Sequence, residues 1–241
     1  MEYLFLISLL AVAFLYSSVG HGGGSGYLAL MAIFGMAPEN MRSTSLTLNI
    51  FVSFIAFVAY FKGGFFRPKL IFPFLLTSIP MAFIGAGIKI NPVTFKIILG
   101  IFLLIAIARM LFIPTAITDQ SKRPPFLISL SIGALLGLFS GMIGIGGGII
   151  LSPILLLMHW ANMKETAAAS AIFIFLNSLA GLSGLLHAGF TFNQHLITWI
   201  IVGIIGSIAG SYSGSFRIPS NQLKYILAAT LLVASIKLFV I

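Results

Sequence analysis

The chain has 241 residues, of which 59% are hydrophobic and only 7% are charged. Soluble domains are about 25% charged, so this chain has too little polar surface for a water-soluble globule, and its composition predicts an all-α polytopic membrane protein surrounded by a lipid bilayer. The Lys and Arg residues are scattered rather than clustered, which argues against nucleic-acid binding, and without cysteine or a metal-ligand spacing we expect no cofactor and no metal.

Apolar runs between glycine, proline and charged residues predict the helices in chain order. The first half has a run at 3–19, a glycine-rich break at 20–26, a short run at 27–36, and long runs at 43–61, 70–88 and 95–113. Residues 114–125 form the only polar linker of any size. The second half has a run at 126–143, a break at 144–148, a short run at 149–160, and long runs at 166–186, 196–215 and 223–241. We therefore predict two transmembrane repeats, 1–113 and 126–241.

The two halves match each other in sequence. Aligning Gly20 with Gly144 also aligns the glycine triplet 22–24 with 146–148. One further residue of offset aligns four more sets in the segments that follow, namely Ser45 with Ser170, Ser53 with Ser178, Gly64-Phe65 with Gly189-Phe190, and Gly85 with Gly210. Matched glycine triplets at the same place in each half indicate an internal duplication, as in many transporters.

Two topologies are compatible with this duplication. If each break is a kink within one full span, there are eight spans and the halves are parallel. If each break is the tip of a re-entrant-like hairpin followed by three spanning helices, the halves are inverted repeats. The hairpin topology leaves only Arg42, Lys89, Lys96 and Lys237 on one side, whereas the eight-span topology divides the Lys and Arg residues almost evenly. Cytoplasmic loops are enriched in these residues, which favours the inverted arrangement with a cytoplasmic linker.

The two glycine breaks form the first candidate site. Each glycine destabilises a helix interior by about 1 kcal/mol relative to alanine, so a triplet is expected where a helix stops and restarts. A helix N-terminus attracts anions through its free N–H groups, and two such ends would bind one without a buried Lys or Arg. The candidate binding residues here are Gly22, Gly23, Gly24, Ser25, Gly146, Gly147 and Gly148. Close helix packing through small residues is the alternative.

Small polar side chains after each break form the second candidate. Ser45, Asn49 and Ser53 are spaced four residues apart and share one helical face. The matching helix of the second half carries Ser170, Asn177 and Ser178. Hydroxyl and amide donors suit a polyoxoanion, and interhelical hydrogen bonding is an equally common use of such residues.

Titratable side chains are rare in the apolar runs. All four acidic residues lie outside them, which argues against carboxylate-based proton or sodium coupling. His21 lies inside the first break, where the second half has Ile145. It is a candidate donor to an anion, with a structural hydrogen bond to a freed carbonyl as the alternative.

Other functional classes are compatible with parts of the sequence. Gly23-Gly24-Ser25-Gly26 matches the four-residue pattern around the nucleophile of rhomboid-type intramembrane serine proteases, with His187 or His195 as the base that such a serine needs. The second half has Ile149 in place of Ser25, which argues against this enzyme. An anion or small-solute channel is a further alternative, but a channel needs a continuous pore rather than a closed site between repeats.

The glycine motifs resemble those of the sulfite exporter TauE/SafE family of membrane permeases. The resemblance rests on the residues V-G-H-G-G-G-S-G at 19–26 and I-G-I-G-G-G-I-I-L-S-P at 143–153, and it covers essentially the whole chain. It implies a non-enzymatic permease of the cell inner membrane that transports sulfite, sulfoacetate or related organosulfonates. We expect the anion to bind between the two breaks and alternating access to move it. A homodimer is a further possibility.

Overall fold

The computed structural model describes residues 2–36, 38–88, 124–187 and 195–223, together with a few isolated positions. Regular structure in this part of the chain is helical: α1 Glu2–Ser18, α2 Gly24–Ile33, α3 Pro38–Lys62, α4 Pro68–Ala86, α6 Phe126–Ile143, α7 Gly148–Leu157, α8 Met163–His187, α9 Leu196–Tyr212 and the π-helix η1 Ser213–Arg217. Five of these helices are long and apolar enough to cross a membrane. The predicted runs at 95–113 and 223–241, and most of the linker, lie outside the described residues.

The observed helices follow the predicted runs, with differences at their ends. Helix α3 begins at Pro38 rather than at 43, because proline is favoured in the first turn of a helix. Helix α8 begins at Met163 because Asn162 and Glu165 cap it reciprocally. The Glu165 backbone N–H donates to Asn162 Oδ1 at 2.9 Å, and the Asn162 N–H donates to Glu165 Oε2 at 3.0 Å.

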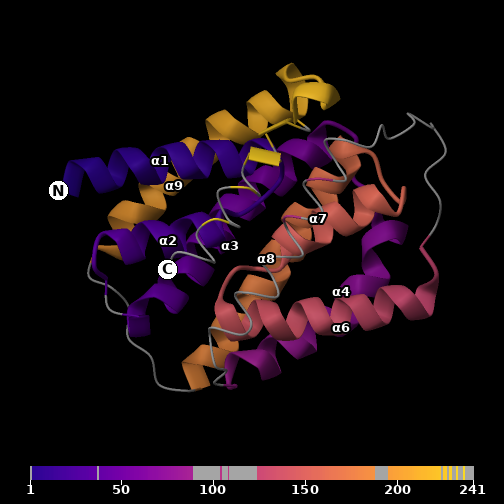
Figure 1. Cartoon of the computed structure of the whole chain (residues 1–241), viewed down its shortest axis with the longest axis horizontal. Helices are drawn as coiled ribbons and strands as arrows, with labels where there is room; N and C mark the ends of the chain where they lie inside the picture. Colours follow the sequence, from indigo (N-terminus) through magenta and orange to yellow (C-terminus); the bar gives the residue numbers. More distant parts are fainter. Residues whose placement is uncertain are drawn as a thin grey trace.

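The six longer helices pack in a fixed order of neighbours. Helices α3 and α8 pack together at the centre, α9 packs on α3 and α4 on α8, and the outer pairs are α1 with α9 and α6 with α4 (Figure 1). Exchanging each helix with its counterpart in the other half (α1 with α6, α3 with α8, α4 with α9) gives the same order. The packing therefore has the internal symmetry that a duplicated chain would give.

The outer pairs pack through glycine. Gly137 of α6 lies so close to α4 that a Cβ atom there would overlap the Ser78 backbone carbonyl. The contact repeats every four residues along both helices, with Gly133 against Phe74 and Gly141 against Ala82. Helix α1 repeats the arrangement with α9 and η1, where Gly206 and Gly210 of α9 and Gly214 of η1 lie against the carbonyls of Leu10, Phe14 and Ser18. Small residues at this spacing allow helix backbones to approach in a membrane, where no hydrophobic force draws helices together.

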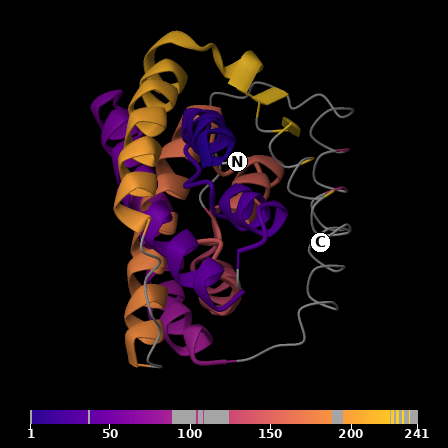
Figure 2. The same cartoon turned by 90° about the vertical axis from the view of Figure 1, so that its left-hand side faces the viewer.

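Helices α1 and α2 form a hairpin. Phe5, near the start of α1, contacts Phe34 just after α2, with 5.3 Å between ring centroids. At the other end, Tyr16 Oη lies 3.1 Å from Ser25 Oγ. The two helices lie side by side in both views (Figures 1 and 2). A ten-residue helix such as α2 is about 15 Å long, roughly half the hydrocarbon thickness of a bilayer. Helix α7 also has ten residues.

We expect Gly137→Ala to lower the midpoint of thermal unfolding in detergent, because the new methyl group has to push α4 away from α6. Overpacking of this kind destabilises by about 1–3 kcal/mol. Gly181→Ala in α8 is the matched control, since its Cβ would lie an ordinary 3.4 Å from Leu46 Cδ1. Alanine is the better helix former, so the control should keep or raise the midpoint. Equal midpoints for the two variants would contradict the close approach.

Candidate substrate site at the two glycine breaks

The two breaks contact each other inside the protein. The Ser45 hydroxyl of α3 lies 2.8 Å from the Gly144 carbonyl oxygen and 3.3 Å from that of Gly24, so it bridges the breaks. A Cβ atom on Gly24 would lie only 3.0 Å from the Ile145 Cα. Helix α2 begins at Gly24 and α7 begins at Gly148, so the N-termini of both short helices reach the same interior region.

The chain enters both short helices through left-handed glycines. Gly23 has φ of 94° and Gly147 has φ of 75°, a conformation that side-chain-bearing residues rarely adopt. Gly147 is the N-cap of α7, and no side chain caps the N–H groups of that first turn. The first turn of α7 therefore keeps donors that can serve a ligand.

Asn49 of α3 projects its amide between the two breaks. The side chain is fully buried, and neither Nδ2 nor Oδ1 has a hydrogen-bond partner. A Cβ atom on Gly22 would lie 2.6 Å from Oδ1, one on Gly24 would lie 2.6 Å from Nδ2, and one on Gly146 would lie 3.2 Å from Nδ2. The glycines therefore let the amide pack directly against the backbone of both breaks. A buried amide without partners destabilises by roughly 1–3 kcal/mol, so this group is arranged for something other than stability.

Ile174 of α8 packs against the same glycines from the other half. Its Cγ2 would lie 2.8 Å from a Cβ on Gly22 and 2.6 Å from one on Gly146. The sequence offset that aligns Ser45 with Ser170 aligns Ile174 with Asn49. The position of the polar Asn49 amide in one half is therefore taken by an apolar side chain in the other.

His21 begins a buried chain of hydrogen bonds that links the two halves. Its Nε2 lies 2.7 Å from Ser152 Oγ of α7, which lies 2.7 Å from Ser170 Oγ of α8. All three side chains are buried, and His21 Nδ1 has no partner. The histidine is therefore bonded to a side chain rather than to a freed carbonyl.

The remaining predicted residues differ in how close they come to the two breaks. Ser178 Oγ has no partner and would lie 3.2 Å from a Cβ on Gly146. Asn177 donates from Nδ2 to the Phe173 carbonyl at 2.8 Å and leaves Oδ1 without a partner. Ser53 donates to the Asn49 carbonyl of its own helix, and Ser25 pairs with Tyr16 rather than with a histidine.

Sequence reasoning did not single out Ser152, Ile174 or Tyr27. Ser152 lies within the second glycine motif, directly before Pro153, and that position was the available signal. The Tyr27 hydroxyl is buried without a partner and would lie 2.8 Å from a Cβ on Gly23. No sequence pattern distinguishes Ile174 from the other apolar residues of its helix.

Arg42 has a structural environment that the sequence does not reveal. Its Nε donates to the Gly141 carbonyl at 3.1 Å, and one terminal nitrogen donates to the Ala86 carbonyl at 2.7 Å and also to that of Gly141. These carbonyls belong to the last turns of α4 and α6, where a cation is favoured by the helix dipole. Arg42 thus joins two helix ends beside the second break.

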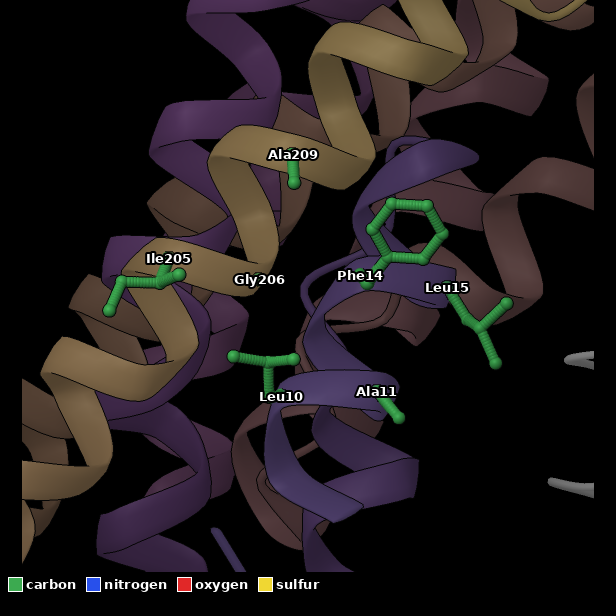
Figure 3. A pocket seen from close by; sticks show the side chains of 7 residues that line it. All are labelled: Leu10, Ala11, Phe14, Leu15, Ile205, Gly206 and Ala209. Atoms are coloured by element: carbon green, nitrogen blue, oxygen red, sulfur yellow. The ribbon is translucent and has the colours of Figure 1, made fainter. Parts of the chain in front are cut away.

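A groove elsewhere on the molecule lacks the chemistry of a site. It lies between α1 and α9, has a volume of about 400 Å³, and is lined by Leu10, Ala11, Phe14, Leu15, Ile205, Gly206 and Ala209 (Figure 3). Leu10, Leu15 and Ile205 are exposed, so the groove faces outwards. It offers no polar side chain to an anion.

Comparison with known proteins fits this architecture. The chain matches the sulfite exporter TauE/SafE family over residues 4–238. It is 30% identical over 236 residues to probable membrane transporter protein y4hK of Sinorhizobium fredii, with 96% of each chain covered. It is 27% identical to probable membrane transporter protein MJ0441 of Methanocaldococcus jannaschii, covering 92% of this chain and 88% of that one. No solved structure matches.

The helical fold and these relatives define a multi-pass membrane transporter. The chain belongs to the sulfite exporter TauE/SafE family, as the glycine motifs indicated. This is a family of permeases and not of enzymes, so the protease alternative is wrong.

We expect Arg42→Met to lower the midpoint of thermal unfolding, because the carbonyls at the ends of α4 and α6 lose a charged donor. The loss should be on the order of 2 kcal/mol of unfolding free energy. Arg217→Met is the control, since Arg217 is exposed and lies over the Tyr212 ring at 5.4 Å. It should change the midpoint little. An unchanged midpoint for Arg42→Met would show that the carbonyl contacts add no stability.

Proposed function

We propose that the protein is a permease for small sulfur-containing oxoanions, such as sulfite, sulfoacetate or related organosulfonates, in the cell inner membrane. The anion binds between the two glycine breaks and is released by alternating access. The family name supports the sulfur oxoanion, and the geometry of the breaks supports the location of the site.

The Asn49 amide is the observation that carries this proposal. It is fully buried, both of its polar atoms lack partners, and it packs directly against glycines of both breaks. A ligand between the breaks would satisfy the amide, and Ser178 Oγ beside Gly146 offers a second donor. The oxygens around the tetrahedral or pyramidal sulfur of such an anion can accept hydrogen bonds from several donors at once.

Electrostatics favours an anion over a cation. The N-termini of α2 and α7 both reach the breaks, and each carries a partial positive charge of about half a unit. No carboxylate is among the buried side chains in the described part of the chain. A cation would meet donors and positive dipole ends there, whereas an anion would be stabilised by both.

Contacts at one end of the molecule support the hairpin topology. Arg67, after α3, forms an ion pair with Glu165 of α8 at 3.2 Å. Lys164 lies over the Phe65 ring at 4.9 Å and donates to the Ser215 carbonyl at 2.9 Å. The eight-span topology would put Arg67 and Lys164 on opposite sides of the membrane, but the hairpin topology puts them on one side. This basic end is the cytoplasmic one by the positive-inside rule.

Two inverted repeats that meet at the breaks suit alternating access. Rocking one repeat against the other would open the site to each side in turn. Asn49, His21 and the other groups at the breaks are buried, so the site is closed in this conformation. A closed site favours a carrier over the channel alternative.

The purified protein in proteoliposomes should transport labelled sulfite and methanesulfonate with saturable kinetics. Unlabelled sulfur oxoanions should compete, whereas chloride should not, because it lacks the array of oxygen acceptors that the break donors would bind. A flux that rises linearly with concentration would indicate the channel instead. No flux and no binding of any sulfur oxoanion by folded protein would overturn the proposed substrate class.

We expect Asn49→Leu to abolish saturable flux while the unfolding midpoint stays the same or rises, because leucine removes two unpartnered buried polar atoms. Thr47→Val is the matched control on the same helix. Thr47 is buried, and its hydroxyl is already bonded to the Ser43 carbonyl at 2.8 Å. The control should keep its flux. Normal transport by Asn49→Leu would show that the Asn49 amide does not bind the substrate.

A further inference from the structure

His21 is unusual among the titratable groups of this protein. It is the only charged or imidazole side chain among the buried residues in the described part of the chain. An ionisable side chain in the interior of a membrane protein is costly and generally functional. The sequence argues against carboxylate-based coupling, but it leaves a histidine inside the first break.

The bonding of His21 leaves one ring nitrogen available. Nε2 is engaged with Ser152 at 2.7 Å, and Nδ1 is buried without a partner. In neutral histidine, Nδ1 is either an empty acceptor or an unused donor. In imidazolium both nitrogens donate, so Nδ1–H would need an acceptor that the protein does not supply.

The chain of hydroxyls can accommodate both protonation states. Either serine of the Ser152–Ser170 pair can be the donor. When Nε2 accepts, the bonds run from Ser170 to Ser152 to His21. When His21 is protonated, Nε2 donates to Ser152, which then donates to Ser170. Rotation of two hydroxyl hydrogens is sufficient, and no side chain has to move.

The groups that face His21 do not supply a counter-charge. From α1, the Tyr16 ring faces the imidazole with 6.3 Å between ring centroids. From α7 and α8, the facing groups are the hydroxyls of Ser152 and Ser170. In the described part of the chain no carboxylate bonds to His21, so the negative charge that would stabilise imidazolium has to come from a ligand.

We propose that His21 binds one proton together with the transported anion, so that the permease is a proton–anion symporter. This inference rests on the proposed function, because it needs an anion at the breaks. His21 directly precedes Gly22, which packs against the unpartnered Asn49 amide. An anion bound between the breaks would place a negative charge near the imidazole and accept a hydrogen bond from Nδ1–H.

Linkage makes the effect of the anion on proton binding reciprocal. Burial disfavours imidazolium when the site is empty, and a neighbouring anion reverses that preference. If the anion favours proton binding, the proton must favour anion binding by the same factor. A monoanion and a proton together are neutral, so the loaded site avoids carrying a net charge across the bilayer.

The test uses methanesulfonate, because a sulfonate remains a monoanion near neutral pH, whereas sulfite itself takes up protons. With equal methanesulfonate on both sides of the proteoliposome, an imposed pH gradient should drive accumulation of the anion on the alkaline side. One-to-one symport predicts about tenfold accumulation for each pH unit. A pH indicator inside the vesicles should register one proton per sulfonate.

His21→Gln is the informative variant, because the Gln amide nitrogen can reach the position of Nε2 and keep the Ser152 bond but cannot titrate. Any flux that remains should follow the sulfonate gradient alone and carry no protons. His195→Gln makes the same change at an exposed histidine and should stay coupled. ¹⁵N-histidine spectra of the wild type should show the His21 resonances moving to imidazolium positions when methanesulfonate saturates the site.

The outcomes separate this inference from the proposed function. Saturable wild-type flux that moves no protons would overturn the symport and leave the permease standing. So would full coupling in His21→Gln, or a His21 imidazole that stays neutral in the presence of bound sulfonate. No wild-type binding of sulfite or methanesulfonate at any pH would overturn the permease itself. If His21→Gln is inactive, the symport is still tested on the wild type, by the number of protons moved per sulfonate and by the His21 resonances.

Discussion

The need to satisfy backbone polar groups away from water governs this structure. Inside hydrocarbon a helix can stop and restart only where protein groups take the freed carbonyls and N–H groups. Ser45 bonds the carbonyl of Gly144 and approaches that of Gly24, and Arg42 takes carbonyls at the ends of α4 and α6. These contacts give hydrogen-bond donors to the freed carbonyls. The N–H groups in the first turn of α7 have no side-chain cap, so they remain available to an anion.

The packing is symmetric, but the chemistry at its centre is not. The neighbour order of the helices is unchanged when the halves are exchanged, and glycine lines both outer helix pairs. Two of the polar groups at the breaks have apolar counterparts, since Ile174 is equivalent to Asn49 and Ile145 to His21. A duplicated chain thus provides two opposed helix ends, and the differences at these two positions place an amide and an imidazole on one side only. The proposed binding and proton coupling both depend on that asymmetry.

Much of the site could be predicted because the conformation of its backbone depends on residue type. A glycine triplet in an apolar run predicts a helix break, and its duplication predicts a pair of breaks. The partner of a buried side chain is a different matter. Ser53 shares the predicted polar face with Asn49, and Asn177 lies on the matching helix of the second half, but both donate to carbonyls of their own helices. Helical spacing predicts the helix face on which a side chain lies. It does not predict the hydrogen-bond partner, because the rotamer depends on neighbours that are distant in the chain.

The sequence by itself determined that the chain is a polytopic helical membrane protein with two glycine breaks, because composition, run length and glycine position act locally. Its motifs also indicated the family. Only the tertiary structure decided that the breaks touch, that Asn49 has no partner, and that His21 reaches Ser152, 131 positions along the chain. It also gave Arg42 its place at two helix ends. Each of these depends on how α3, α7 and α8 pack, and close packing of distant segments has no signature in any one of them.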